Sequence, residues 1–226
     1  MRAPLSIVIP TLNAASTLAP VLGALGEGLN AGLIRELIVS DGGSTDATLL
    51  IAHEAGAVVV NGATGRGGQL RRGADAAQGT WLLFLHADTA LATGWSDAVL
   101  SHLGTKKAAY FQLSFIEDGF GPRIVAGWAN LRARLFGLPY GDQGLLISGE
   151  LYRAIGGYAD FPLMEDVAIA RALKGKLIRL PVTAITSGQR YVQGGWLRKG
   201  ACNLWTLVRY FAGVKPEKLA KDYRHK

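Results

Sequence analysis

Four short apolar runs alternate with helix-like stretches over the first ninety residues, and this alternation limits the possible folds more than any other feature. The runs are 5–9, 37–40, 57–60 and 81–85. Runs of this length suit strands buried on both faces of a sheet and are too short for membrane helices. The resulting order, β-α-β-α-β-α-β with short links, predicts an α/β fold with a doubly wound, mostly parallel sheet and helices on both faces.

Polar residues follow these runs where each predicted strand ends. The turn 10–13 follows the first run, Asp41 follows the second, and the fourth stops at His86-Ala87-Asp88. In an open α/β sheet, ligands bind at the carboxyl ends of the strands. Asp88 is therefore expected at the rim of a cleft, where a carboxylate can hold a divalent cation that in turn holds a diphosphate. The alternative is that Asp88 only caps the following turn.

A glycine-rich stretch, 65–73, precedes a helix predicted over 74–78. Glycines before a helix let backbone N–H groups approach an anion, and arginines add positive charge. The stretch matches neither the dinucleotide fingerprint nor the P-loop. An anion-binding loop and a flexible surface loop are both consistent with it.

The pattern loosens beyond residue 90. Strands are predicted over 108–115, 145–147 and 177–182, the last at a sheet edge because Pro181 lacks an N–H group. Helices are predicted over 95–103, 123–136, 150–155 and 167–173. Glu165 and Asp166 open the last of these helices. The helix macrodipole stabilises acids at that position, and one of the two carboxylates can equally point away from the helix and act as a general base.

The charge balance favours an anionic partner. Lys and Arg number 24 against 17 Asp and Glu, a net charge of +7, which suits a nucleotide, a nucleic acid or an acidic membrane surface. No basic run is long enough for a nucleic-acid-binding tail, so we expect no nucleic-acid partner. The stretch from Gly195 onward interleaves aromatic and basic residues. It predicts an amphipathic helix that lies on an anionic membrane, packs on its own domain or contacts a second subunit.

The cysteine count and the lengths of the apolar runs indicate the cellular compartment. Cys202 is the only cysteine, so no internal disulfide is possible, as suits a reducing compartment. The first residues lack the apolar core and cleavage site of a signal peptide, and no apolar run reaches the roughly 18–20 residues that span a bilayer. We expect a cytoplasmic protein, with peripheral contact at the inner face of the membrane as the alternative that the tail suggests.

Seven motifs, in this order, resemble those of glycosyltransferase family 2, which has the GT-A fold. They are IPTLN, DGGSTD, GRGGQLRRGAD, LFLHADT, GDQGLLISG, MEDVAIARALKG and TSGQRY. Within that family the chain looks most similar to a small bacterial subgroup named rSAM/selenodomain-associated transferase 2. The resemblance runs almost end to end. It implies a Rossmann-like GT-A catalytic domain over 1–195, with a nucleotide-binding half (1–90) and an acceptor-binding half (91–195), followed by a basic, aromatic tail (196–226).

The resemblance also implies an activity: transfer of a sugar from a nucleotide-diphosphate sugar to an acceptor hydroxyl, with inversion. By position, Asp166 matches the general base, with Glu165 beside it. Asp88 matches the ligand of Mn²⁺ or Mg²⁺, and Asp142 and Gln143 match the acceptor side. The residues implied to contact the nucleotide sugar are Pro10, Thr11, Asn13, Asp41, Gly43, Arg66, Gly67, Gln69, Ala87 and Arg190.

Two residues depart from the family pattern. His86 stands where relatives carry the first acid of the Asp-x-Asp metal motif, and Ala14 stands where many relatives carry an acid. Metal binding would then depend on Asp88 together with ligand oxygens. That arrangement suits a cation that keeps several waters and binds through one carboxylate and substrate phosphates.

Three other classes of function are the alternatives to sugar transfer. A nucleotidyltransferase on the same fold needs a basic signature near the first strand, and residues 10–20 have no Lys or Arg. A nicotinamide dehydrogenase needs the missing dinucleotide fingerprint. A basic module that binds membrane or nucleic acid without catalysis is consistent with the charge alone, and strongly salt-dependent DNA binding would identify it.

Overall fold

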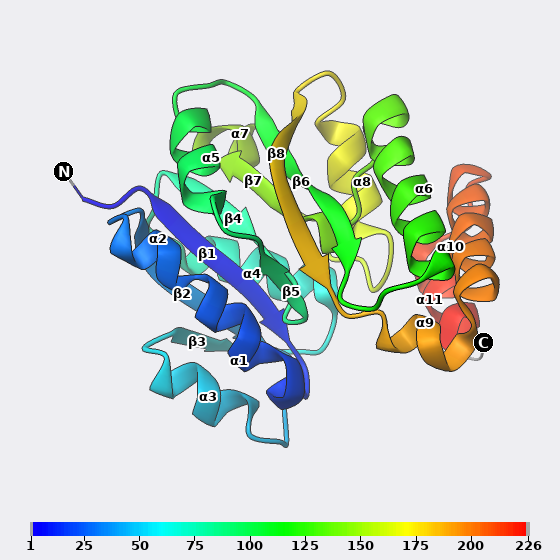
Figure 1. Ribbon diagram of the computed structural model, residues 1–226, viewed down its shortest axis with the longest axis horizontal. Helices are drawn as coiled ribbons and strands as arrows, with labels where there is room; N and C mark the ends of the chain where they lie inside the picture. Colours follow the sequence, from blue (N-terminus) through cyan, green and yellow to red (C-terminus); the bar gives the residue numbers. More distant parts are fainter. Residues whose placement is uncertain (1, 225–226) are drawn as a thin grey trace.

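A computed structural model describes residues 2–224, except for the side chains of Arg190, Gln193 and Arg224. One eight-stranded sheet runs through it in the order β3-β2-β1-β4-β7-β6-β8-β5 (Figure 1). Its strands are β1 (Leu5–Thr11), β2 (Ile34–Asp41), β3 (Val58–Asn61), β4 (Trp81–Phe84), β5 (Thr89–Leu91), β6 (Ala108–Phe115), β7 (Leu145–Ser148) and β8 (Leu177–Thr186). The α-helices are α1 (Ala15–Ala24), α2 (Gly26–Asn30), α3 (Thr48–Glu54), α4 (Arg66–Ala76), α5 (Trp95–His102), α6 (Phe120–Phe136), α7 (Gly149–Ala154), α8 (Glu165–Ala172), α9 (Gln189–Gly194), α10 (Trp196–Phe211) and α11 (Pro216–Arg224), and a 3₁₀ turn, η1, spans Gly141–Gln143.

The strand directions explain where a ligand can bind. Strands β1 to β4 pair in parallel, as do β6 and β8, while β7 is antiparallel to both β4 and β6, and β5 is antiparallel to β8. Within the described residues, six of the eight strands therefore point the same way, which confirms the predicted mostly parallel α/β sheet. The carboxyl ends of these six strands lie along one edge, and the turn η1 that precedes β7 lies at the same edge.

Both faces of the sheet are covered by helices, as predicted. Side chains that alternate along β1 show this most simply, since Leu5, Ile7 and Ile9 pack with α1 and α5 while Val8 packs with α4, α7 and α8 on the other face. All four are fully buried. Each such side chain contributes about 1.5–3 kcal/mol to stability through burial. Because both faces of these strands are buried, their residues are apolar at successive positions and do not alternate with polar ones.

The prediction that Pro181 places its strand at an edge was wrong. Strand β8 lies between β6 and β5. Its pairing with β6 shifts register near the proline, from Tyr110 opposite Arg179 to Gln112 opposite Thr183. This irregularity leaves the proline outside the regular ladder, so its missing N–H group costs no ladder hydrogen bond.

The glycine-rich stretch 65–73 is also not the loop that its composition predicted. It forms most of helix α4, which begins at Arg66. Its glycines allow close packing: a β-carbon on Gly67 would lie 2.7 Å from the Phe161 amide nitrogen, and one on Gly73 would overlap Val8 of β1. Contact with distant segments therefore outweighs the low helix propensity of glycine.

The tail, α10 and α11, packs on the domain through a small separate core. Its members come from the tail, α8 and the segment after α6, and they are Leu138, Met164, Val167, Ala170, Leu207 and Leu219. In Figure 1 these helices stand beside α6 at the right of the sheet. No helix among residues 2–224 is both long enough and apolar enough to cross a membrane.

Candidate active site

Two clefts meet at the carboxyl edge of the sheet. The larger, about 470 Å³, is bounded by the turn after β1, the start of α4 and the segment after β4. The smaller, about 150 Å³, is bounded by η1, the start of α8, the end of β8 and the tail. The residues that line both are Arg66, His86, Asp88, Leu163 and Ser187. Ligand pockets commonly occupy about 300–1,000 Å³, so only the larger cleft has room by itself for a nucleotide.

The larger cleft gathers many of the residues that the sequence predicted to contact a nucleotide. Those that line it are Pro10, Thr11, Asn13, Arg66, Gln69 and Ala87, and the predicted metal ligand Asp88 lines it with them. Asn13 helps to shape the wall, because its φ of 51° is in the left-handed region and its side-chain oxygen accepts the Thr45 N–H. The helical start of α4, at Gly65 and Arg66, opens into the same cleft.

Asp41, which was predicted to contact the nucleotide base, does not line this cleft. Its side chain is buried and accepts hydrogen bonds from the Thr11 and Ser44 hydroxyls and from the Gly43 and Ser44 N–H groups. Burial opposes ionisation of this carboxyl, but the hydrogen bonds outweigh burial and keep its pKa below the ordinary value. Asp41 and Gly43 therefore hold the 41–44 turn against β1, and the expected base contact would require this turn to open.

Gln143 and Gln69 are both buried amides that join separate segments. Gln143 has no exposed surface and donates to the Phe111 carbonyl and to the side chain of Asn130, at 3.3 Å each. Gln143, predicted to contact an acceptor, therefore lines neither cleft. Gln69 donates to the carbonyls of Thr11 and Ser40, so it joins the start of α4 to β1 and β2. Gly67 lies away from both clefts and packs against residues 159–161.

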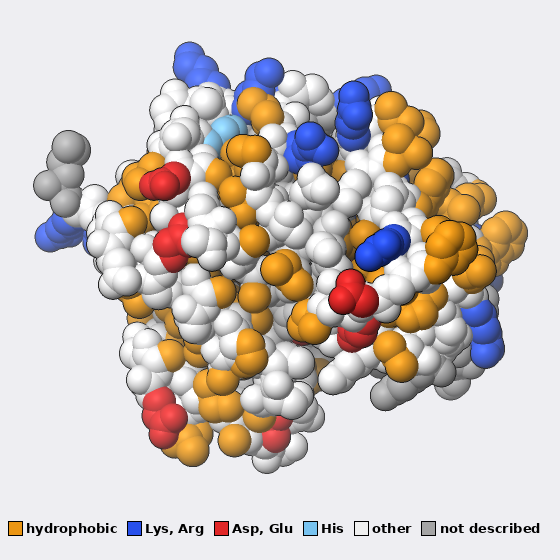
Figure 2. Space-filling view, in the orientation of Figure 1, with side chains coloured by type: hydrophobic (Ala, Val, Ile, Leu, Met, Phe, Trp, Pro, Cys, Tyr) orange, Lys and Arg blue, Asp and Glu red, His pale blue; other side chains and the backbone are white. Residues whose placement is uncertain are grey.

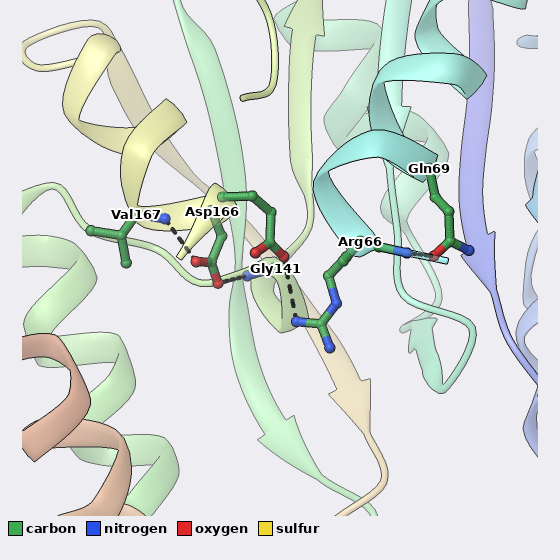
Figure 3. A network of polar contacts seen from close by, with 7 residues as sticks. Arg66, Gln69, Gly141, Asp166 and Val167 are labelled. Carbon is green, nitrogen blue, oxygen red and sulfur yellow. Dashed lines mark hydrogen bonds and ion pairs between the residues drawn. The ribbon is translucent and has the colours of Figure 1, made fainter. Parts of the chain in front are cut away.

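An ion pair spans the junction of the two clefts. Arg66 Nη1 lies 3.5 Å from Glu165 Oε1, and Glu165 is only 1% exposed. In Figure 3 the Arg66 side chain extends from the start of α4 toward the side where Asp166 lies in the first turn of α8. Burial raises the pKa of Glu165 to about 7, the charge of Asp166 adds to this shift, and Arg66 opposes it.

Asp166 is better exposed than its neighbour and faces the smaller cleft. Its Oδ2 accepts the Gly141 N–H at 3.1 Å and its Oδ1 accepts the Val167 N–H at 2.7 Å (Figure 3). Met164, just before the helix, has a φ of 68°. A left-handed backbone at a non-glycine residue is sparsely populated and is often found at functional sites. The start of α8 thus turns sharply and directs Glu165 and Asp166 to different partners.

Asp142 also lines the smaller cleft. Burial raises its pKa to about 6, and the Arg132 guanidinium opposes that shift. Arg132 is itself buried, lies 3.4 Å over the Tyr140 ring and donates to the Leu138 carbonyl. Asp142 thus lines the cleft within the electrostatic influence of a buried positive charge.

The carboxylates where the two clefts meet fit one divalent cation that takes most of its ligands from outside the protein. Asp88 lines both clefts, but among the described residues no three His, Cys, Asp or Glu side chains form a ligand cluster. Asp142 Oδ1 and Glu165 Oε2 are buried without a hydrogen-bond partner in the described part of the chain. Excess negative charge around one accessible carboxylate suits Mg²⁺ or Mn²⁺ bound with phosphate oxygens and water.

Several lining residues of the smaller cleft were missed from the sequence. They are Phe115, Tyr140, Tyr191, Lys199, Asn203 and Tyr223. Three of them form a chain of hydrogen bonds, in which Asn203 donates to the Tyr191 hydroxyl and Tyr223 donates to Asn203. In the sequence, the aromatic residues of the tail were the only feature that could have indicated these lining residues. Arg190, predicted to contact the diphosphate, has a side chain outside the described part of the structure.

The chain resembles known proteins in both sequence and fold. The model of the family Glycosyl transferase family 2 matches residues 6–144, which is more than half of the chain. A PGL/p-HBAD biosynthesis glycosyltransferase from Mycobacterium bovis (strain BCG / Pasteur 1173P2) is 41% identical over 99 residues, which are 40% of this chain and 38% of that protein. The chain thus spans well under half of the length of the curated relatives that it matches.

Solved structures share the fold at lower identity. Glucosyl-3-phosphoglycerate synthase from Mycobacterium tuberculosis, in complex with Mn²⁺, uridine diphosphate and glucosyl-3-phosphoglycerate, is 22% identical with a TM-score of 0.56; the match covers 81% of this chain and 70% of that one. S. aureus TarS 1–349 in complex with uridine diphosphate is 15% identical with a TM-score of 0.62, over 84% of this chain and 62% of that one. At these identities the likeness shows a common fold.

Proposed function

The chain belongs to glycosyltransferase family 2 and has the GT-A fold, and from that premise we propose that it transfers a sugar from a nucleotide-diphosphate sugar to an acceptor hydroxyl with inversion. The observation that carries the proposal is the meeting of two clefts at Arg66 and Asp88. A group-transfer enzyme needs this arrangement, because donor and acceptor must touch at the reacting carbon. The expectation of inversion comes from the family resemblance alone.

The larger cleft suits the donor. Its walls offer backbone groups of the turn after β1 together with Arg66 and the amino-terminal end of α4. A helix amino terminus and a guanidinium group both favour phosphate. Because two proteins of the same fold are described as binding uridine diphosphate, uridine nucleotides are the first donors to test.

Asp88 is the residue that would hold Mn²⁺ or Mg²⁺ here, with diphosphate oxygens and water as the other ligands. When bound, the ion supplies Lewis-acid stabilisation of the negative charge that develops on the leaving diphosphate. Arg66, which lines the same clefts, contributes to this stabilisation. Four carboxylates surround its guanidinium; burial opposes the positive charge, but these acids outweigh burial and raise the pKa of Arg66. Arg66 therefore stays charged through the reaction.

Asp166 is the proposed general base. It reaches the smaller cleft beside the shared residues, and hydrogen bonds from Gly141 and Val167 fix its carboxylate. A carboxylate held in this way can take the proton from an acceptor hydroxyl as the oxygen attacks the anomeric carbon. The aromatic rings of Phe115, Tyr140 and Tyr191 would hold the body of the acceptor, and Asp142 would orient its hydroxyl.

A thermal-shift panel of nucleoside diphosphates and nucleotide sugars, each with and without Mn²⁺ or Mg²⁺, tests the donor class. We expect one nucleoside diphosphate and its sugars to raise the melting temperature only when the metal is present, because ligands that bind only the native state stabilise it. Absence of a shift with every nucleotide would contradict the proposal.

A further inference from the structure

Helices α6 and α10 form a large apolar surface outside both clefts. Of the nineteen large hydrophobic side chains exposed in the described part of the chain, eleven are on these two helices. They are Phe120, Ile124, Trp128, Leu131, Leu135, Phe136, Leu197, Leu204, Trp205, Val208 and Phe211. Figure 2 shows hydrophobic side chains gathering over α6 and α10 at the right of the view. We refer to these eleven residues as the α6–α10 surface.

The two helices are adjacent, so their exposed stripes belong to one surface. A β-carbon on Gly200 of α10 would lie 3.6 Å from Val125 of α6, and Gly121 of α6 lies against Trp196 of α10. Exposed apolar residues recur at helical spacing on each helix, for example Ile124, Trp128, Leu131 and Leu135 along α6. A stripe with this period occupies one side of a helix.

Both helices differ from an ordinary surface helix, because polar side chains lie on their inner side and large apolar side chains on their outer side. On α6, Asn130 and Arg132 point inward, where Asn130 bonds Leu113 and Arg132 bonds Leu138. On α10, Lys199 and Asn203 line the smaller cleft. Several polar side chains of these helices therefore face the protein, while eleven large apolar side chains face outward. Soluble monomers rarely expose large contiguous apolar patches, and such patches mark interaction sites.

The charges on these helices indicate what covers the surface. Residues 120–136 and 196–211 contain six basic residues and no Asp or Glu. Arg123, Arg134 and Arg198 are exposed among the apolar side chains. A second copy packed on this face would bring arginines against arginines, and the two helices themselves have no carboxylates to neutralise them. An anionic lipid surface supplies the negative charge and also accepts the apolar side chains.

We propose that the α6–α10 surface binds the face of an anionic membrane, with its apolar side chains at the boundary of headgroups and acyl chains. Helices of this kind lie in the interface, and their affinity depends on buried apolar area and on attraction to anionic lipid. Trp128 and Trp205 suit that depth, where tryptophan is enriched. The proposal does not depend on the sugar-transfer activity.

Flotation of the full chain with vesicles tests it. We expect binding to equimolar phosphatidylglycerol and phosphatidylcholine, weaker binding to phosphatidylcholine alone, and weakening by salt. The double variant Leu135→Gln/Trp205→Gln should bind at least about tenfold more weakly, since both side chains lose apolar burial. Arg123→Gln/Arg198→Gln should lose about fivefold per arginine.

The matched control is Leu29→Gln/Leu50→Gln. Leu29 and Leu50 are 62% and 60% exposed, against 62% and 55% for Leu135 and Trp205, and they lie on α2 and α3, away from this surface. This control should bind vesicles like the wild type, and an unchanged melting temperature should show that each variant is folded. No binding of the wild-type chain to anionic vesicles, or equal binding by Leu135→Gln/Trp205→Gln, would overturn the proposal. A wild-type dimer in analytical ultracentrifugation that this same variant dissociates would assign the surface to a second copy instead.

Discussion

At the scale of single residues, the neighbours Glu165 and Asp166 have different environments. Successive residues of a helix point about 100° apart, so at the start of α8 one acid turns toward Arg66 and the other toward the smaller cleft. Glu165 is buried and paired, whereas Asp166 accepts only backbone N–H groups in the described part of the chain. This difference assigns the proposed proton transfer to Asp166.

Substitution Asp166→Asn tests that assignment. The asparagine keeps the shape of the side chain but cannot accept a proton from the acceptor. We expect sugar transfer to fall about 10²–10⁴-fold, with the dissociation constant for the nucleoside diphosphate unchanged in calorimetry. Transfer close to the wild-type rate would show that another group is the base.

Glu165 should make the stability of the protein depend on pH. Burial raises its pKa from an ordinary 4.5 to about 7. Between these values the unfolded chain releases the proton and the native state retains it, so the free energy of unfolding falls as pH rises from about 4.5 to about 7. We expect Glu165→Gln to remove much of this fall, a difference of more than about 1 kcal/mol, in urea unfolding near pH 4.5 and above pH 7.

The exposed Glu54 of α3 provides the control for this measurement. Glu54→Gln should leave the pH dependence of the wild type intact. Parallel pH profiles for Glu165→Gln and the wild type would mean that burial does not perturb this carboxyl.

Side-chain direction marks the limit of what the sequence predicts at this scale. Asp88 lines both clefts, as its position after a strand predicts, and Asp166, which the family resemblance implies as the general base, lines the smaller one. Asp41 also follows a strand, yet it points inward. Its orientation depends on Thr11, thirty residues away, and on the local turn at Ser44. A pattern along the chain contains no information about such a distant partner.

At the scale of elements, the start of α4 depends on glycine at position 67. A β-carbon there would overlap the Ala159 carbonyl and lie 2.7 Å from the Phe161 nitrogen, both backbone atoms that cannot rotate away. We expect Gly67→Ala to destabilise the protein by about 1–3 kcal/mol, as overpacking does. It should also weaken nucleotide binding, because Arg66 shifts with the helix. Urea unfolding and calorimetry measure the two effects.

Gly23, at an exposed position of α1, is the matched control. No atom lies within 4 Å of the position that its β-carbon would take. Gly23→Ala should therefore raise stability by about 0.5–1 kcal/mol, since glycine is costly inside a helix. Similar effects of the two substitutions would contradict the packing role of Gly67.

Elements formed by strong local patterns were predicted well. The strand expected over 108–115 has those bounds in the structure, and the run 81–85 became β4 with one residue fewer. The three-residue strand β5 was missed because its pairing with β8 involves residues almost a hundred positions away. The helical start of α4 was missed for a similar reason, since contacts with 159–161 and β1 make its glycines compatible with a helix.

At the scale of the whole molecule, the tail completes the smaller cleft. Lys199, Asn203 and Tyr223 reach the site from α10 and α11, beyond the 6–144 region that the family model matches. The hydrogen bonds of Asn203 with Tyr191 and Tyr223 join α9, α10 and α11. Acceptor preference should therefore depend on the tail, while donor binding depends on the first half of the chain.

Asn203→Ala tests whether acceptor binding and donor binding depend on these separate parts of the chain. Loss of both hydrogen bonds should loosen the tail side of the cleft and raise the KM for the acceptor about five- to tenfold, as expected for roughly 1 kcal/mol. The dissociation constant for the nucleoside diphosphate should not change. A matching loss of donor affinity would show that the two clefts are not separate in function.

Titration calorimetry of uridine diphosphate, with and without Mn²⁺, tests the central claim most directly, namely that the two clefts meet at a metal-dependent diphosphate site on Asp88. The wild type and Asp166→Asn should bind the nucleotide tightly only with Mn²⁺, and Asp88→Ala should lose that metal-dependent gain. If the wild type binds equally well without metal, or if Asp88→Ala keeps the full effect of Mn²⁺, the account of this site is wrong.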